Sequence, residues 1–201
     1  MTLSVDKDSV IIVFSVMKNI QQAKDKLRKE IRSQKKEYSE DELYSKSEEV
    51  LSVVEITGVF QDAKTIFFYN ALSDEVQTID FIRKWGQKKD FYLPVMNGDD
   101  LLFRKCTPDS GFNQSALGIM EPEGENFTDY RKVDLIIIPG MAFDRKMNRL
   151  GRGRGFYDRF LPAISAPKMG ICFDFQLFDQ IPSDGNDVKM DYIVSENDLI
   201  W

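Results

Sequence analysis

The feature that most constrains the fold is the run VDLIIIPG at Val133–Gly140, which is apolar at successive positions. Successive side chains of a β-strand point to opposite faces of the sheet, so a strand with one solvated face alternates apolar and polar residues. A run that is apolar on both faces is typical of a central strand in a parallel sheet covered by helices. The run therefore predicts a sheet enclosed between two helical layers.

A strand, a helix and a second strand precede this run. TIFFYN is β-rich and ends in turn residues, and DFYLPV forms the next short strand. The stretch between them has apolar residues at helical spacing. Such a unit predicts parallel strands joined by a right-handed crossover. The ranges are 65–70, 74–89 and 90–95, and the apolar helical positions are Val76, Ile79, Ile82 and Trp85.

Two further helices are predicted near the N-terminus. The first spans 18–34 and the second begins at Ser39, whose pairing with Glu42 forms a capping box. The positions expected to face the core are Ile20, Ala23, Leu27 and Ile31 in the first helix, and Leu43, Val50, Leu51 and Val54 in the second. On spacing alone, Lys24 and Arg28 form a solvated basic stripe on the first helix.

The C-terminal half supplies the remaining elements. An edge strand is expected at 100–106, and two later strands at 168–175 and 191–196. GFYDRFL at 155–161 begins a helix that Pro162 limits. The predicted fold is α/β, a three-layer arrangement in which a mostly parallel twisted sheet carries helices on both faces.

The chain is predicted to form a single domain. It has 201 residues, 42% of them apolar, and no repeat or linker interrupts it. We expect the domain to span 18–201 and residues 1–17 to form an N-terminal extension, either loose or a strand fragment, with Met17 as an alternative start. The apolar part of this extension, 9–17, is too short to span a membrane.

Composition excludes several classes of function. The net charge of −6 argues against a chain-wide attraction to nucleic acid. The absence of histidine removes Ser-His-Asp catalysis and HExxH zinc chemistry. Cys106 and Cys172 have no metal-binding spacing, and we expect both to be core residues of a cytoplasmic protein with no membrane partner.

The stretch NRLGRGRGFYDRF at 148–160 is the strongest candidate site. It follows the central strand and opens a helix, and open α/β sheets bind ligands at that edge. Glycines allow positive φ and close approach of backbone N–H groups to an anion, which predicts a phosphate site. The glycines are Gly151, Gly153 and Gly155, and the nearby basic residues are Arg145, Lys146, Arg149, Arg152, Arg154 and Arg159.

Asp158 is an acidic residue in this basic stretch. A carboxylate beside a polyphosphate indicates a bridging cation, so the pattern favours a magnesium nucleotide. Three alternatives stay open on the residues alone. These are a glycine-rich turn with a helix-capping aspartate, a non-catalytic nucleotide- or folate-binding protein, and an RNA-contacting segment of the RGG type. The stretch is neither a Walker A loop nor GxGxxG.

The segment IIIPGMAFDRKMNRLGRGRGFYDRFL at 136–161 resembles the signature of the 5-formyltetrahydrofolate cyclo-ligases. Asn148 stands where that family commonly has glycine, a mild change because Asn tolerates the left-handed region. KDKLR at 24–28 resembles the family's phosphate-contacting K-x-x-L-R, and LSDEVQT at 72–78 resembles its substrate-side segment, with Gln77 in place of an acidic residue. Segments 118–125 and 186–196 are also similar.

The resemblance implies an ATP- and Mg²⁺-dependent enzyme that converts 5-formyltetrahydrofolate to 5,10-methenyltetrahydrofolate with release of ADP and phosphate. It implies catalytic roles for Arg149, Arg152 and Tyr157, and metal ligation by Asp158 and Asp187. It implies ATP contacts from Lys24, Arg28, Arg149, Leu150, Gly151, Arg152, Gly153, Arg154, Gly155, Phe156 and Tyr157. It implies substrate contacts from Leu72, Glu75, Gln77, Phe143 and Glu121. We expect a monomer with no nucleic-acid partner.

Overall fold

The computed structural model describes residues 7–107, 110–114 and 118–201, with side chains described from Met17 onward. A seven-stranded sheet forms its centre, in the order β12-β11-β9-β6-β1-β2-β3. The pairs among β11, β9, β6, β1 and β2 are parallel, and only the two edge strands run antiparallel. The strands are β1 Thr65–Phe67, β2 Asp90–Asn97, β3 Asp100–Cys106, β6 Leu135–Pro139, β9 Lys168–Ile171, β11 Tyr192–Val194 and β12 Leu199–Ile200.

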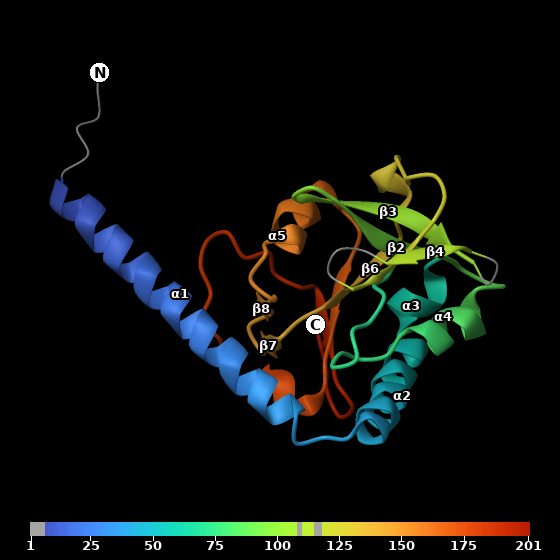
Figure 1. Ribbon diagram of the computed structural model, residues 1–201, viewed down its shortest axis with the longest axis horizontal. Helices are drawn as coiled ribbons and strands as arrows, with labels where there is room; N and C mark the ends of the chain where they lie inside the picture. Colours follow the sequence, from blue (N-terminus) through green and yellow to red (C-terminus); the bar gives the residue numbers. More distant parts are fainter. Residues whose placement is uncertain (1–6, 108–109, 115–117) are drawn as a thin grey trace.

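Helices cover both faces of the sheet (Figure 1). One face packs under α2 (Glu40–Ile56), α3 (Gly58–Asp62) and α4 (Ile79–Trp85). The other lies under α5 (Phe156–Phe160) and the 3-10 turn η2 (Leu161–Ala163). The central strand β6 is buried at four successive positions, as its sequence requires. The predicted three-layer α/β class with a mostly parallel sheet is confirmed.

The capping box at Ser39 and Glu42 is confirmed, and the four predicted core positions of α2 are buried. The edge strand at 100–106 is β3, and both cysteines are buried and free. Among the described residues, no helix is both long enough and apolar enough to cross a membrane.

Helix α1 spans Lys7–Lys35, so it begins well before residue 18. Residues 7–17 continue this helix, and the expectation of a loose extension or strand fragment there was wrong; residues 1–6 lie outside the described part. No proline or glycine interrupts 7–35, so nothing in the backbone chemistry stops the helix. In Figure 1, α1 (blue) runs along one side of the molecule, beside the small strands β7 and β8.

The buried face of α1 differs from the predicted one. Its most buried positions are Lys24, Arg28, Ile31 and Lys35, which recur at helical spacing, whereas Ala23 is exposed. The interpretation of Lys24 and Arg28 as a solvated stripe was therefore wrong. These cations are buried because loops from the rest of the chain supply carbonyl and carboxylate acceptors for them.

Helix α4 begins at Ile79, later than the predicted start at Asp74. Residues 72–78 form a loop whose side chains bond to other elements instead of continuing the helix. The Gln77 N–H donates to Ser47 Oγ on α2, and the Thr78 hydroxyl donates to the Tyr69 carbonyl. Asp74 and Glu75 accept bonds from Lys35 and Arg152.

Several short elements lie outside the predicted set. A three-stranded sheet has the order β10-β7-β8, and a hairpin joins β4 and β5. Two further 3-10 turns flank β6 and β9. Their bounds are β4 Phe112–Gln114, β5 Met120–Pro122, β7 Ala142–Asp144, β8 Arg149–Leu150, β10 Leu177–Phe178, η1 Tyr130–Lys132 and η3 Asp174–Gln176.

The turn between β7 and β8 is organised by the carboxylate of Asp144, which is fully buried. This carboxylate accepts bonds from the backbone N–H groups of Lys146, Asn148 and Ile181, each at 2.9 Å. The Asn148 side-chain amide also donates to it. The left-handed residue of the turn is Met147, with φ of 67°, and not Asn148. Asn148 thus acts here through its amide and its backbone.

Candidate functional site

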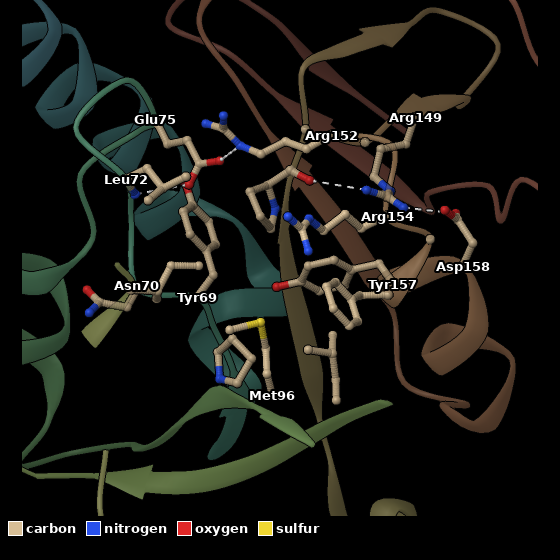
Figure 2. Close-up of a pocket in the computed structure, with 18 of the residues that line it drawn as sticks. Tyr69, Asn70, Leu72, Glu75, Met96, Arg149, Arg152, Arg154, Tyr157 and Asp158 are labelled. Atoms are coloured by element: carbon tan, nitrogen blue, oxygen red, sulfur yellow. Dashed lines mark hydrogen bonds and ion pairs between the residues drawn. The ribbon is translucent and has the colours of Figure 1, made fainter. Parts of the chain in front are cut away.

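The chain encloses a cavity of about 310 Å³ beside the carboxyl ends of β1 and β6 (Figure 2). Tyr69 and Asn70 follow β1, and Pro139 and Gly140 end β6, so two adjacent parallel strands supply one wall. The residues that line it are Tyr69, Asn70, Leu72, Glu75, Pro94, Met96, Leu101, Ile119, Glu121, Pro139, Gly140, Arg149, Gly151, Arg152, Arg154, Gly155, Phe156, Tyr157 and Asp158.

The lining divides into an apolar part and a charged part. Met96, Pro94 and Leu101 come from β2 and β3, and with the rings of Tyr69 and Tyr157 they offer flat apolar surface. The charged groups are Glu75, Glu121, Asp158 and three arginines of the glycine-arginine loop, residues 149–155. This combination suits a ligand that has a planar ring system and an anionic part.

Arg149 is the most buried cation of this loop, with 4% of its surface exposed. Its Nη2 donates to Asp158 Oδ1 at 2.8 Å, and its guanidinium lies 5.4 Å from the centre of the Tyr157 ring. Among the described residues, its Nε has no hydrogen-bond partner. A buried donor of this kind is costly unless something accepts from it, so Arg149 is equipped to bind an oxygen of a ligand.

Two of the three loop glycines adopt the predicted positive φ: Gly153 at 98° and Gly155 at 68°. Gly151 serves close approach instead. A Cβ built on Gly151 would lie 2.8 Å from Nη1 of Arg149, so a side chain there would displace the guanidinium. The loop then enters α5, a helix of one turn.

Arg152 reaches across the cavity to the 72–78 loop. Its Nε donates to Glu75 at 2.8 Å, and its Nη2 donates to Asp74 (Figure 2 shows the bond to Glu75). Arg154 differs, because its guanidinium has no ion pair with any described residue although it lines the cavity. Arg154 is thus a cation at the cavity whose charge is left for a ligand.

Helix α1 supports this loop from outside the cavity. Arg28, 8% exposed, donates from Nε to the Gly151 carbonyl at 2.9 Å. Lys24, 5% exposed, is paired with Asp184 at 2.6 Å and Asp187 at 2.7 Å. Burial opposes the charge of Lys24, but the two aspartates outweigh it and raise its pKa. Arg28 thus contacts the glycine-arginine loop and Lys24 contacts the 184–187 segment, and neither residue lines the cavity.

The two residues proposed as metal ligands are both held by cations. Asp158 pairs with Arg149, and Asp187 pairs with Lys24 and also accepts the Asp184 N–H at 2.7 Å. No group of three or more acidic, cysteine or histidine side chains arranged for a metal occurs in the described part of the chain. Mg²⁺ is commonly held by one or two carboxylates together with phosphate oxygens. Asp158, which lines the cavity, fits that pattern for a metal that arrives with a nucleotide.

Burial raises the pKa of the Tyr157 phenol well above its ordinary value, and the Glu75 carboxylate adds to this while Arg149 opposes it. Tyr69 is buried as well, and its hydroxyl donates to the Val76 carbonyl at 2.9 Å. Both phenols therefore stay protonated and act as hydrogen-bonding or packing groups rather than as bases near neutral pH.

Seven predicted site residues do not line the cavity: Lys24, Arg28, Gln77, Phe143, Leu150, Gly153 and Asp187. Leu150 and Phe143 are fully buried core residues, and the Phe143 ring fills the space beside Gly140 and Gly170. Both side chains therefore have packing roles, and their contacts with ligands stay predictions. The Gln77 amide donates to the carbonyls of Leu72 and Glu75, so it braces the loop from behind.

Several lining residues escaped sequence reasoning. Asn70 could have been found, because it directly follows a predicted parallel strand at the edge where ligands bind. Its amide donates to the Met120 carbonyl at 2.8 Å and links the cavity to the β4–β5 hairpin. Met96 and Ile119 carry no local signal, since the antiparallel pairing of β2 with β3 and the packing of β5 against them bring these residues here.

Comparison with known proteins agrees with this architecture. The chain is 34% identical over 139 residues to 5-formyltetrahydrofolate cyclo-ligase of Haemophilus influenzae, covering 65% of this chain and 74% of the relative. It is 27% identical over 201 residues to the probable 5-formyltetrahydrofolate cyclo-ligase of Caenorhabditis elegans, covering 92% and 98%.

The solved structures give the same result. The NMR structure of 5,10-methenyltetrahydrofolate synthetase from Aquifex aeolicus superposes with a TM-score of 0.80 at 32% identity, covering 88% of this chain and 91% of that one. The synthetase from Mycoplasma pneumoniae gives a TM-score of 0.70 at 26% identity, covering 87% and 99%. The sequence model of one family matches residues 20–196. The chain belongs to the 5-formyltetrahydrofolate cyclo-ligase family.

Proposed function

We propose that this protein is an ATP-dependent ligase that converts 5-formyltetrahydrofolate to 5,10-methenyltetrahydrofolate, with release of ADP and phosphate. Family membership supports the activity, and one structural observation supports its location. The cavity joins an apolar wall to the cations of the glycine-arginine loop, so a pterin ring and a triphosphate can meet in it.

The chemistry needs no histidine. The formyl oxygen is a poor leaving group until it takes the γ-phosphoryl group of ATP, which releases ADP. The second folate nitrogen then attacks the activated carbon, which closes the ring, and loses its proton; the C–O bond breaks, and phosphate departs to leave the methenyl bridge. The protein contributes by positioning the reactants and by balancing developing negative charge, the requirements of phosphoryl transfer.

Named residues divide this work. Arg149 offers a buried guanidinium with a free N–H, and Arg154 offers an unpaired one, so both suit phosphate oxygens. Arg152 lies next to Glu75, between the nucleotide and the folate sides. Glu75, Leu72 and Glu121 line the wall opposite the loop and would contact the pterin. Tyr157, kept protonated by burial, can donate to the formyl or phosphoryl oxygen.

Arg28 would act on ATP chiefly by fixing the loop, because it bonds to the Gly151 carbonyl, and Lys24 would act by holding Asp187. Mg²⁺ would offset the charge of the phosphates, with Asp158 as its cavity ligand and Asp187 as a second carboxylate. Asp158 and Asp187 would then each bind the metal while remaining ion-paired with Arg149 and Lys24, respectively.

A direct assay tests this function. The methenyl product absorbs in the near ultraviolet, where the formyl substrate does not, so protein with MgATP and 5-formyltetrahydrofolate should raise that absorbance. Blanks without ATP or without protein should stay flat. If folded protein binds both ligands by calorimetry but produces no absorbance, it is a non-catalytic binder and the proposal is wrong. RNA contact would instead appear as a salt-sensitive gel shift.

A further inference from the structure

One charged cluster adjoins the cavity and includes two groups, Lys35 and Asp74, that have no role in the reaction described above. It consists of Lys35, Asp74, Glu75 and Arg152, which come from α1, from the 72–78 loop and from the glycine-arginine loop. Lys35 is 4% exposed and sits at the end of α1. Its ammonium donates to both the backbone carbonyl and the carboxylate of Asp74. The two cations balance the two carboxylates, so the cluster has no net charge.

Asp74 is the centre of this cluster. Its carboxylate receives Lys35 at 3.3 Å on one oxygen and the Arg152 Nη2 on the other. Burial disfavours its charge, yet the two cations outweigh burial and lower its pKa. Asp74 therefore stays ionised and ties Arg152 to a loop that the buried end of α1 holds in place.

Glu75 shares Arg152 with Asp74. One Glu75 oxygen accepts from Arg152 Nε at 2.8 Å, and the other accepts the Leu72 N–H at 3.1 Å. Glu75 is 8% exposed and lines the same cavity as Arg154. A ligand that donates hydrogen bonds to Glu75 would compete for the carboxylate that Arg152 now uses. Arg152 would then be less tightly held and freer to turn toward an anion in the same cavity.

We propose that Asp74, anchored by Lys35, is a positioning residue that holds Arg152 against Glu75 and so makes folate and nucleotide bind cooperatively. The inference rests on the proposed function, with Glu75 on the folate side and Arg152 serving the nucleotide. Coupling of this kind is reciprocal, so each ligand must tighten the other by the same factor.

The test measures that factor by calorimetry. The dissociation constant of a non-hydrolysable ATP analogue with Mg²⁺ is determined with and without saturating 5-formyltetrahydrofolate. Wild-type protein should show tightening by about fivefold or more, the lower range of measured couplings. Asp74→Asn keeps the size and one acceptor but loses the charge, and its factor should fall close to one. Asp62→Asn, at an exposed carboxylate of α3, is the matched control and should keep the wild-type factor.

Lys35 provides a second and independent variant. Lys35→Met should also reduce the factor, whereas Lys36→Met, its exposed neighbour, should not. Lys35→Arg keeps a cation and should restore part of the coupling. These comparisons separate positioning from loss of fold, because thermal melts of all variants are recorded beside the binding data.

The outcomes are distinct. A wild-type factor near one, or an unchanged factor in folded Asp74→Asn, overturns the positioning role while leaving the ligase activity intact. Absence of both turnover and binding in wild-type protein overturns the proposed function, and this inference with it. Coupling that falls in Asp74→Asn and Lys35→Met but persists in both controls supports the inference.

Discussion

The two halves of the glycine-arginine loop differ sharply. In the first half, Arg149 and Leu150 are buried, and β8 pairs with β7. In the second half, residues 152–154 are exposed and two glycines take positive φ. The first half thus belongs to the core and fixes one cation, while the second presents two cations at the surface of the cavity. One motif therefore supplies a buried, fixed cation, Arg149, and two more exposed cations, Arg152 and Arg154.

Replacing the fixed cation should have the largest effect. We expect Arg149→Met to lower kcat by about a hundredfold to a thousandfold, the scale of losing one preorganised donor. It should also lower the free energy of unfolding by about 1–3 kcal/mol, because Asp158 loses its partner. Absorbance kinetics and urea melts measure both. Arg145→Met, at an exposed arginine paired with Asp198, is the control. Equal effects in both variants would show that Arg149 has no special role as the fixed cation of the loop.

Arg152→Ala and Asp158→Ala should each lose most turnover, about a hundredfold. Both should remain folded: Arg152→Ala should melt within a few degrees of wild type because its side chain is 34% exposed, and Asp158→Ala should melt somewhat lower because it breaks the same Arg149 pair. Activity assays and thermal melts on the same samples provide the check. If both variants unfold, the glycine-rich turn with its capping aspartate is structural, and the phosphate interpretation fails.

Gly151→Ala tests the boundary between the halves. The added Cβ would lie 2.8 Å from Arg149 Nη1, so the guanidinium must move. We expect a loss of kcat of about thirtyfold, because a displacement of ~1 Å can cost up to about a hundredfold. Gly185→Ala is the control, since a Cβ there meets nothing within 4 Å. Full activity in Gly151→Ala would show that the Arg149 position is not critical.

Arg154→Ala should act on binding more than on chemistry. Its guanidinium has no ion pair with a described residue, so the fold loses nothing when it is removed. The KM for ATP should rise about tenfold, as expected for one charge-assisted hydrogen bond, with little change in Tm. Lys at this position should restore much of the affinity. A change in kcat alone would place Arg154 in the chemical step.

The smallest expected effect concerns pH. The pKa of Asp74 lies below its ordinary value of 3.8 in the folded protein, since Lys35 and Arg152 outweigh burial. The contribution of the Asp74 carboxylate to stability is therefore complete above pH ~3.8, the ordinary pKa, and is lost as the pH falls through the lowered pKa of the folded state. Urea melts should show a steeper acid-side loss of stability in wild type than in Asp74→Asn. Identical slopes would mean that the cluster forms no favourable pair.

The sheet was predictable because its signals are local. The apolar run that became β6 and the capping box of α2 require no distant partner to be recognised. The start of α4 and the buried face of α1 could not be predicted in this way. In the sequence, Lys24, Arg28 and Lys35 look like solvated cations. The fold places their acceptors beside them, and these acceptors come from distant segments: Asp184 for Lys24, the Gly151 carbonyl for Arg28 and the Asp74 carbonyl for Lys35.

The candidate site follows the same division. The glycine-arginine loop and Glu75 were accessible from sequence, and the structure places them around one cavity. The side chains of Phe143 and Leu150 lie in the core, which a motif alone does not reveal, and their ligand contacts stay predictions. Asp158 was assigned to a metal on its charge and on the family resemblance, and its partnership with Arg149 depends on how β8 and α5 pack.

Helix α1 also sets the spacing of three loops around the site. Lys24, Arg28 and Lys35 contact three separate loops from one face of a single helix. Eleven residues separate the first from the last, ~16 Å at the rise of an α-helix. The positions of those loops therefore depend on the rise and rotation per residue of this helix. Inserting one residue between Arg28 and Lys35 would turn Lys35 by ~100° away from its acceptors while Arg28 kept its own.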